Sequence, residues 1–496
     1  MHLFLIKANQ LFETLPDIHD DTRFLMIESH HISNQNKYHK QKLYFLFSAM
    51  RKYKKFLEEK KYNVSYYTLQ DNESLKNKND FNQRLHEEIE KYKTKTLHIF
   101  RDVDPHVEKE RIEQCRKWQI DLKVHDSPMF LNNRSEYEKE KYKNAKKLAF
   151  MPFYTEQRKK FDILLTTHGS PEGGQWSYDT ENRKPLKGDA YLPREEKIKV
   201  AKVANDDIST AVETYFTDHP GDIINWLPTT HKDAKEWLHE FLETSLEKFG
   251  TYEDAVRKDD FILYHSVLTP MLNAGLITPQ EIVEETLSFA KTHNTSLNNL
   301  EGFIRQIIGW REYMYLTYLN KHETLLKTNF FAFDRSMPDA FYIGKTGIDP
   351  IDQTIKKALH TGYIHHIERL MILGNFMLLC RIKPQDIYLW FLELFVDAYP
   401  WVMSPNVMGM SQFGGGIITT KPYISSSQYV LKMSDYKKGD WCHVWDSLYW
   451  TFLADYEDKL HNNYRMKFMY NILSKKSSAQ MKDYQETANA FLKNLK

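Results

Sequence analysis

The chain has 496 residues, which is enough for two or three domains and a large hydrophobic core. Its 68 Lys and Arg nearly balance its 67 Asp and Glu, so the chain is not a polycation, and a nucleic-acid partner would need a local basic face. Its cysteines (Cys115, Cys380 and Cys442) are odd in number and widely spaced, which excludes a secreted disulfide scaffold and favours a reducing compartment.

The apolar segments of the sequence indicate no membrane contact. The stretch MHLFLIKANQ has one short apolar run and no cleavage-site pattern, so we expect no signal peptide. The most apolar segment, 388–399, carries Glu393 and Asp397 and is too short to span a bilayer. We therefore expect a cytoplasmic protein, and a monomer.

Residues 1–127 alternate between strand and helix patterns. An amphipathic stretch at 43–61 predicts a helix. Short apolar or alternating runs predict strands at 2–6, 23–28, 62–69, 96–100 and 120–125. This alternation predicts a Rossmann-like α/β domain with a parallel sheet and covering helices. No GxGxxG pattern follows the first run, so the usual dinucleotide site is not expected.

Residues 128–195 are predicted to connect two domains. The first part is rich in Lys but has interspersed Glu, which is typical of a solvated helix face. The segment 169–188, GSPEGGQWSYDTENRKPLKG, is Gly-rich, contains Trp176 and Tyr178 and ends in basic residues. Flexible backbone, stacking groups and cations suit a loop that meets DNA. A loop that packs between domains is the alternative.

Residues 196–496 are predicted to form a large all-α domain. Apolar residues recur at three- and four-residue spacing at 233–249, 279–293 and 447–460. Thr278-Pro279 places a proline in the first turn of one of these helices. The sequence contains neither an internal repeat nor a low-complexity tract.

Two stretches of this domain predict a binding pocket. Ser266 and Thr269 stand three residues apart just before a proline and a helix pattern, where hydroxyls and backbone N–H groups can bind phosphate, although such residues also cap helices. The stretch 397–436 is broken by Pro400, Pro405 and a Gly-Gly-Gly run, yet it is rich in large apolar side chains. We expect a long loop that forms the floor of a pocket.

Several sequence blocks together resemble the photolyase/cryptochrome superfamily, and within it the iron–sulfur bacterial cryptochromes and (6-4) photolyases. They are DAYPWVMSPNVMGMSQF (397–413) with TTKPY (419–423) and KMSDY (432–436), YHSVLTPMLNAGLITP (264–279), EGFIRQIIGWREY (301–313), GYIHHIERLMILGNF (362–376) and GGQWSYDTENRKPL (173–186). The resemblance covers most of the C-terminal two thirds. It implies that the helical domain binds FAD and that residues 1–127 form an antenna-type domain.

The resemblance also implies flavin contacts. Ser266, Leu268 and Thr269 match the segment that binds the flavin diphosphate, and Asn406 matches a residue that faces flavin N5 and can influence its protonation state. The remaining cofactor-binding residues implied in this way are Tyr252, Trp310 and Asp397.

A second set of residues is implied to contact damaged DNA. Two histidines that share a metal on one helix face are usually spaced i,i+4. His365 and His366 are adjacent, which argues against a shared metal, and we predict no metal site. Histidine titrates near neutrality and can donate a proton, so His366 is the expected proton donor, supported by His365. Tyr423 and Tyr429 are expected to line the catalytic pocket, while Arg183, Glu301 and Met410 are expected to contact the substrate.

Electron transfer and antenna residues follow from the same resemblance. Trp390 matches a tryptophan on the electron route to the flavin, but Phe391 and Ile343 stand where other aromatic side chains are expected, so we add Tyr399 as a candidate. The antenna pigment of this branch is a lumazine (6,7-dimethyl-8-ribityllumazine). Its candidate positions are Asn9, Gln10, Tyr38 and Lys42, although Ala8-Asn9-Gln10 departs from the family's turn.

The sequence predicts no iron–sulfur cluster. A [4Fe–4S] cluster needs four thiolates, and the chain has three cysteines. Lys437 and Asp440 stand where this branch has a Cys-x-x-Cys. We expect Trp441, Trp445 and Tyr449 to hold the region instead.

The sequence thus predicts a light-driven, FAD-dependent photolyase that repairs (6-4) photoproducts in UV-damaged DNA. Two alternatives share the fold and the flavin: a cryptochrome-like photoreceptor without repair, and a cyclobutane-dimer photolyase. A DNA-binding scaffold without flavin is the third.

Overall fold

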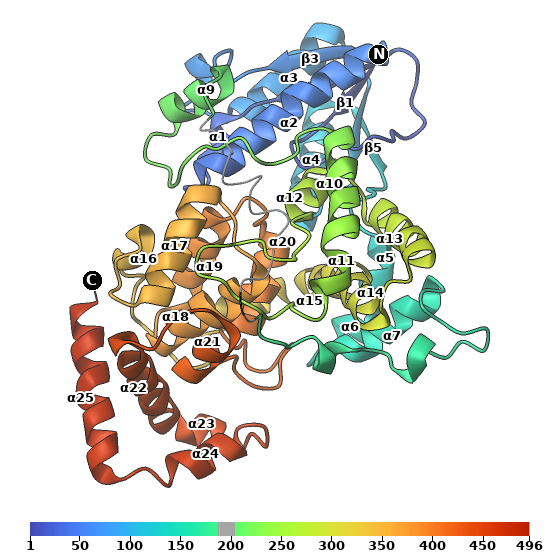
Figure 1. The fold of residues 1–496 in the computed structure, drawn as a ribbon. Helices are drawn as coiled ribbons and strands as arrows, with labels where there is room; N and C mark the ends of the chain where they lie inside the picture. The colour runs from blue at the N-terminus through green and yellow to red at the C-terminus, as the bar shows by residue number, and fades with distance from the viewer. Residues whose placement is uncertain (187, 189–203, 496) are drawn as a thin grey trace.

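The computed structural model describes residues 1–186, 188 and 204–495. Its N-terminal part is a five-stranded, fully parallel sheet in the order β3-β2-β1-β4-β5 (Figure 1). The strands are β1 (His2–Leu5), β2 (Thr22–Ile27), β3 (Asn63–Tyr67), β4 (Thr96–Phe100) and β5 (Asp121–His125). The predicted parallel α/β domain is confirmed.

Both faces of the sheet are covered because side chains alternate along each strand. Phe4 and Phe24 pack with residues of α2 on one face, whereas Leu3 and Leu25 pack with residues of α3 and α4 on the other. The helical elements of this part are α1 (His30–Ser33), α2 (Lys40–Glu59), η1 (Glu73–Leu75), α3 (Asp80–Tyr92) and α4 (Pro105–Trp118).

The strand order reverses between β1 and β4, which is where open parallel sheets bind ligands. Lys7 follows β1 and Asp102 follows β4, and the two side chains form an ion pair. Asn9 and Gln10 lie in the same loop after β1.

The connector begins directly after β5 and wraps around the helical domain. Its short elements are α5 (Arg134–Tyr137), α6 (Glu140–Lys143), α7 (Phe150–Lys160), η2 (Glu172–Gly174) and η3 (Asp179–Glu181). Tyr137 donates to the carboxylate of Glu312, which ties α5 to the helical domain. The predicted boundary at residue 195 lies outside the described residues.

The rest of the described chain is helical, as predicted. Its elements are α9 (Asp207–Tyr215), α10 (His231–Thr244), α11 (Leu246–Phe249), α12 (Thr269–Ala274), α13 (Pro279–His293), α14 (Leu297–Ile304), η4 (Arg305–Arg311), α15 (Glu312–Lys327), α16 (Ala340–Ile343), α17 (Asp349–Thr361), η5 (Glu368–Gly374), α18 (Asn375–Leu379), α19 (Pro384–Leu394), α20 (Pro400–Met403), η6 (Ser404–Ser411), α21 (Ser427–Met433), α22 (Asp440–Asp455), α23 (Glu457–Leu460), α24 (Lys467–Leu473) and α25 (Ser478–Asn494). Thr278 and Glu281 form a capping box at the start of α13, with Pro279 in the first turn.

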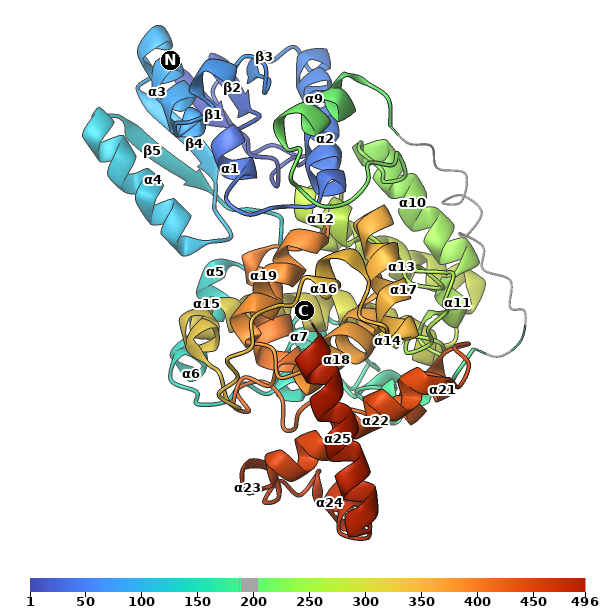
Figure 2. The ribbon, with the colours of Figure 1, turned by 90° about the vertical axis from the view of Figure 1, so that its left-hand side faces the viewer.

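The α/β and helical parts are packed together tightly. α9 lies beside α2, where Tyr44 donates to Asp206 and Arg51 pairs with Asp207 (Figure 2). Gly221 has a φ of 85° and touches the ring of His39, where a Cβ would lie 1.9 Å from Nε2, so only glycine fits there.

The C-terminal helices form the end of the helical domain farthest from the sheet (Figures 1 and 2). There α25 packs along α22, whose Trp445 is fully buried. None of the helices in the described ranges is long and apolar enough to cross a membrane.

One prediction about local structure is wrong. The stretch 397–436 was expected to be a long loop, but it contains α20, η6 and α21. Pro400 lies in the first turn of α20 and Pro405 in the first turn of η6, where a missing N–H costs no helical hydrogen bond. The longest irregular part is the segment between η6 and α21.

Candidate functional site

Three π-helical segments, η4, η5 and η6, carry or flank several of the candidate site residues: Trp310 lies in η4, Asn406 and Met410 lie in η6, and His366 lies two residues before η5. π-helices are rare and are found mostly at functional sites. η5 and η6 approach closely at Gly374, where a Cβ would lie 2.1 Å from Ser411 Oγ. The sequence blocks that suggested a flavin pocket therefore meet in space.

Asp397 is the centre of a hydrogen-bonded group drawn from three distant segments. Arg369 of η5 forms a two-pronged ion pair with it, at 2.8 Å from Nη1 to Oδ1 and 3.3 Å from Nη2 to Oδ2. Thr269 donates its hydroxyl to Asp397 Oδ2 at 2.6 Å, and Asn273 Nδ2 donates to the Asp397 carbonyl at 2.9 Å. Because its carboxylate is already neutralised, Asp397 can position Arg369 and Thr269 for a ligand.

Thr269 begins α12, and the backbone before it is unusual. Val267 has a φ of 53° and Leu263 a φ of 50°, conformations that side chains rarely adopt and that a β-branched residue strongly disfavours. Leu268 is buried in the core, whereas Thr269 is exposed and the Ser266 carbonyl accepts from Trp237 Nε1 at 2.8 Å. Such local strain is typical of a ligand-binding turn.

His365 and His366 have different surroundings. His365 is fully buried; its ring stacks on His265 at 4.5 Å, and its Nε2 lies 3.5 Å from Glu368 Oε2. His366 is exposed, yet protein surrounds it so closely that burial, together with Arg369, lowers its pKa to about 4. His366 therefore presents an exposed ring close enough to the Arg369–Asp397 pair to feel both charges.

This pKa corrects one expectation. His366 was expected to titrate near neutrality, but in the free protein its ring is neutral at pH 7. The cause is the loss of water around the ring and the nearby guanidinium of Arg369, both of which disfavour the imidazolium.

The residues expected to meet the substrate gather on one side of the molecule. Arg183 forms an ion pair with Asp179, and Arg183 also lowers the pKa of Asp254, although burial raises that pKa to about 6. Burial raises the pKa of Tyr423 and Tyr429, and both also feel the charges of Asp254 and Arg183. The structure thus brings Arg183, Tyr423 and Tyr429 together.

Glu301 does not reach this surface. It is fully buried, and its carboxylate accepts from Tyr154 Oη at 2.8 Å, from Arg305 Nε at 3.1 Å and from the Tyr178 amide at 3.0 Å. The expected substrate contact is therefore corrected: Glu301 has no accessible surface, and it anchors the segment that carries Arg183.

The other expected pocket residues lie on or next to the π-helices. Trp310 stacks on Phe150 at 3.8 Å, and Met410 is buried in the same hydrophobic cluster, against which Tyr423 packs. Asn406 is half-buried in η6 and donates to the Val402 carbonyl at 2.8 Å. Tyr252 lies apart from them, 5.8 Å from the ring of Tyr264.

Trp390 is linked to the Asp397 group by one intervening ring. It is fully buried, its Nε1 donates to the Phe341 carbonyl, and its ring lies 6.0 Å from that of Phe395. The Arg369 guanidinium in turn lies 4.1 Å from the centre of the Phe395 ring.

Lys42 and Tyr38, predicted antenna positions, instead contact the helical domain. The Lys42 ammonium lies 4.5 Å from the ring centres of both Tyr38 and Tyr399 and donates to the Ala398 carbonyl. Burial lowers the pKa of Lys42 to about 7. Gln10 donates to the Phe100 carbonyl, and among the described residues its Oε1 has no partner.

Sequence reasoning missed Arg369 and Asn273, which complete the Asp397 group. Arg369 follows His366 by three residues, so the two share a helix face, and this spacing was the available signal. No pattern marks Asn273, because its role depends on a contact across 124 residues.

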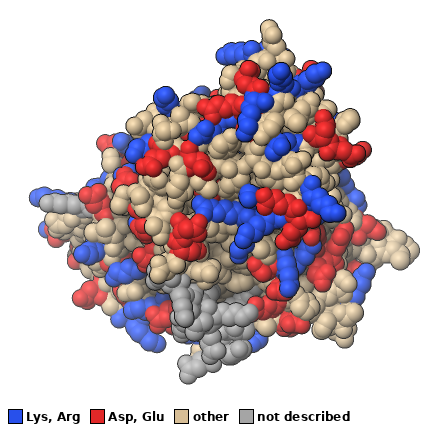
Figure 3. All heavy atoms as spheres, turned by 90° about the horizontal axis from the view of Figure 1, so that it is seen from above, with Lys and Arg blue, Asp and Glu red and all other residues tan. Residues whose placement is uncertain are grey.

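Two other surfaces are relevant to ligand binding. A groove of about 1140 Å³ lies between α10, α13 and residues 225–229, and its lining combines acidic side chains with Lys52, Lys235 and apolar residues. On the face in Figure 3, which is seen from above, Lys and Arg are interspersed with Asp and Glu and form no patch of one sign.

The comparisons with known proteins agree with this geometry. A family model described as deoxyribodipyrimidine photo-lyase-related protein matches residues 4–226, and one described as FAD binding domain of DNA photolyase matches residues 303–488. A curated (6-4) photolyase from Agrobacterium fabrum is 34% identical over 470 residues, which is 92% of each chain.

Two solved structures share the fold. A class III photolyase from Agrobacterium tumefaciens has a TM-score of 0.59 at 17% identity and covers 99% of this chain and 97% of its own. A Synechocystis cryptochrome has a TM-score of 0.57 at 12% identity, with 100% and 98% coverage.

Proposed function

Because this chain belongs to the photolyase/cryptochrome family and carries a FAD-binding domain, we propose that it is a light-driven photolyase that repairs (6-4) photoproducts in DNA. The observation that carries the proposal is the position of His366, whose exposed ring lies within the electrostatic reach of Arg369 and Asp397. A proton donor has to be accessible to the substrate, and His366 meets this requirement.

The residues around Asp397 suit the flavin. Thr269 and Arg369 present a hydroxyl and a guanidinium, groups that bind phosphate and carbonyl oxygens. The Asn406 amide lies on η6 and the Trp310 ring on η4, and both would contact the ring system. When bound and reduced, FAD supplies the photoexcited electron, and the protein fixes geometry and protonation.

His366 supplies the proton. In the free protein it is neutral, and the negative charge of bound DNA would raise its pKa and favour the imidazolium. The positive charge of Arg369 limits this rise. A flipped-out photoproduct would enter between Tyr423, Tyr429 and Arg183, at a cost of roughly a few kcal/mol for unstacking.

The DNA-facing surface would extend from this pocket to the segment 461–468. Tyr464 and Phe468 are 74% and 71% exposed, the highest values among large hydrophobic side chains in the described ranges. Asn463 donates to the Thr420 carbonyl at 2.7 Å, which places the segment beside Lys421. Burial lowers the pKa of Lys421, and the nearby charges of Arg465 and Arg183 lower it further, so three cations share this surface. Exposed rings next to cations suit DNA bases and phosphates.

We propose a lumazine antenna at the point where the sheet order reverses. The unpartnered Gln10 Oε1 and the half-buried Asn9 support a ligand there, whereas Tyr38 and Lys42 are engaged by the helical domain. The test is the absorbance and mass of pigment released from denatured protein, and release of FAD alone would contradict it.

A cryptochrome-like photoreceptor is the second candidate. Two observations favour it: His366 is neutral in the free protein, and Ile343 is 52% exposed where the family pattern has an aromatic side chain. Monomeric state and cytoplasmic location are expected under both proposals, and the buried cysteines, none of which is in a disulfide, suit a reducing compartment.

The test is a blue-light repair assay on two oligonucleotides, one with a (6-4) photoproduct and one with a cyclobutane dimer. We expect repair of the (6-4) photoproduct alone, abolished in the dark and in His366→Ala, and unchanged in His293→Ala, an exposed histidine at the end of α13. Repair of the dimer would assign cyclobutane activity. Absence of repair by a flavin-loaded protein would assign the photoreceptor.

A further inference from the structure

Four histidines lie in a row that crosses the sheet diagonally, from His19 and His2 at the start of β1, through His98 in the middle of β4, to His125 at the end of β5. His2 Nδ1 is 2.9 Å from His98 Nε2, and His98 Nδ1 is 2.9 Å from His125 Nε2. The ring of His19 stacks on that of His2 at 4.8 Å, with 10° between the planes. The photolyase chemistry uses none of these residues.

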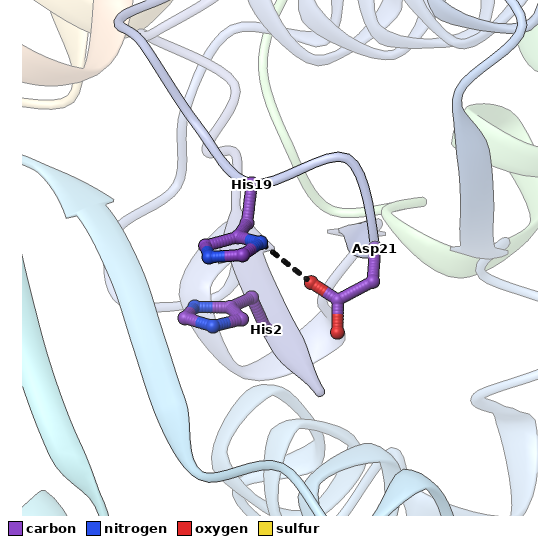
Figure 4. A group of neighbouring side chains, drawn as sticks. All are labelled: His2, His19 and Asp21. Carbon is purple, nitrogen blue, oxygen red and sulfur yellow. Dashed lines mark ion pairs between the residues drawn. The ribbon is translucent and has the colours of Figure 1, made fainter.

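The fold brings the outer end of this row next to a carboxylate. His2 pairs with Thr22 in the sheet register, so Asp21 and His19, at the end of the β1–β2 loop, come to lie beside His2 (Figure 4). His19 Nδ1 lies 3.6 Å from Asp21 Oδ1. One donor atom from each of His2, His19 and Asp21 lies within 4.8 Å of the others.

From this cluster we propose a binding site for a divalent transition-metal ion, best represented by Zn²⁺, with His2, His19 and Asp21 as ligands. Two imidazoles and a carboxylate are a donor set that Zn²⁺ accepts, at about 2.0–2.2 Å per bond, and three protein ligands leave one position for water. The stacked rings need only side-chain rotation to converge, and the 72% exposure of His19 and 53% exposure of Asp21 allow it.

The hydrogen bonds behind His2 favour this role. Metal-bound histidines usually donate their other ring N–H to a partner, which fixes the tautomer. If His2 Nδ1–H donates to His98 Nε2 and His98 Nδ1–H donates to His125 Nε2, then His2 Nε2 keeps its lone pair for the metal. His98 and His125 would thus orient His2 without touching the ion.

Metal binding would tie the end of the β1–β2 loop to β1. The other end of this loop is already attached to the helical domain, because the Leu11 amide donates to the Ala274 carbonyl at 2.9 Å. The ion would therefore make the loop that carries Asn9 and Gln10 more rigid at its second end.

The test uses untagged, full-length, flavin-containing protein stripped of metal with EDTA. Zn²⁺ is titrated in competition with a chromophoric chelator. We expect His19→Ala and Asp21→Asn each to weaken one site per chain by at least about tenfold, because each removes a ligand. The control is His239→Ala, whose ring is similarly exposed and lies 3.0 Å from Glu243 on a single helix.

Two results would overturn the proposal: no zinc bound by the wild-type protein, or equal affinity in wild type and the His19→Ala, Asp21→Asn double variant. Thermal unfolding provides a second measurement, since Zn²⁺ should raise the Tm of the wild type and of His239→Ala but not of the double variant. Circular dichroism confirms that every variant is folded.

Discussion

At the residue scale, His366 sets the expected pH dependence of repair. Burial and Arg369 lower its pKa to about 4 in the free protein, and its protonated form is the donor. We therefore expect the repair yield per flash to rise as the pH falls from 8 to 5. The measurement is a flash-repair series on the (6-4) oligonucleotide, and an increase with rising pH would contradict His366 as the donor.

A second prediction concerns the hydroxyl of Thr269. Its bond to Asp397 Oδ2 is 2.6 Å long, and a hydrogen bond to a charged group contributes about 1.5–3 kcal/mol. Thr269→Val should weaken flavin retention by roughly tenfold or more, whereas Thr269→Ser keeps the hydroxyl and should behave as wild type. The ratio of flavin to protein after dialysis measures this, and equal loss in both variants would mean that the hydroxyl is not responsible.

Single residues were predictable from the sequence where a local motif marks them. Thr269 and Asp397 fall into this class, and both lie in the hydrogen-bonded group. Glu301 does not belong to this class. Its i,i+4 spacing to Arg305 is equally compatible with an ion pair on the surface and with the buried ion pair that the structure contains. Burial depends on the connector segment that covers Glu301, and that contact spans 123 residues.

At the scale of elements, the α-helices and strands could be predicted from the sequence, whereas the π-helices could not. Apolar spacing of three and four residues predicts a helix, but a π-segment inserts only one extra residue per turn and leaves the surrounding periodicity intact. Pro405 was interpreted as a helix breaker, although it starts η6. The sequence therefore did not indicate the backbone form of the segments for which a flavin pocket is predicted.

The packing of α22 against α25 gives a prediction about the C-terminal helices. Trp445 is fully buried, and its Nε1 donates to the Ser425 carbonyl at 3.0 Å, next to the buried Trp441 and Tyr449. If these rings replace a cluster, Trp445→Ala should lower the free energy of unfolding by about 3–5 kcal/mol. The exposed Tyr342→Ala is the control. Denaturant unfolding measures the difference.

Metal analysis completes this test. We expect no stoichiometric iron, since four thiolates are required and Lys437 and Asp440 occupy two of the positions. About four irons per chain would contradict the prediction that packing of Trp441, Trp445 and Tyr449 takes the place of an iron–sulfur cluster.

The segment 461–468 gives a prediction about DNA binding. Stacking of a base on an aromatic ring contributes about 1–3 kcal/mol, so Tyr464→Ala with Phe468→Ala should weaken binding of damaged duplex severalfold or more. Arg465→Gln should reduce the slope of log affinity against log salt concentration by the amount that corresponds to about one phosphate contact. Tyr342→Ala, on α16, is the matched control. Fluorescence anisotropy at several salt concentrations measures both effects, and unchanged affinity in the double variant would remove this segment from the DNA surface.

At the scale of the whole molecule, the fold class was predicted correctly, but the packing of the α/β part against the helical part was not predictable. Each domain carries its own periodicity, so a parallel sheet followed by helices was predictable. The packing of α9 on α2 and the position of Lys42 between Tyr38 and Tyr399 depend on contacts between distant segments. No local pattern encodes such contacts, and for this reason the contacts of Tyr38 and Lys42 with the helical domain were not predicted.

Buried ionisable groups predict how the stability of the whole chain varies with pH. Burial lowers the pKa of His39 to about 4, below its unfolded value of about 6.5, so the unfolded state binds more protons in this range. Stability attributable to His39 is complete above pH 6.5 and declines by about 3 kcal/mol as the pH falls to 4. The pKa values of His98, His265, His365 and His366 are lowered as well and act in the same direction.

Buried carboxyls act in the opposite direction. Burial raises the pKa of Glu253 to about 8 and that of Glu368 to about 7, so their contribution is complete at low pH and declines as the pH rises through these values. Since the shifted histidines outnumber these carboxyls, we expect maximal thermal stability near pH 6.5. The measurement is Tm from pH 4 to 9 for wild type and His39→Gln, whose acid-side decline should be shallower. Parallel curves would show that His39 is not held neutral by burial.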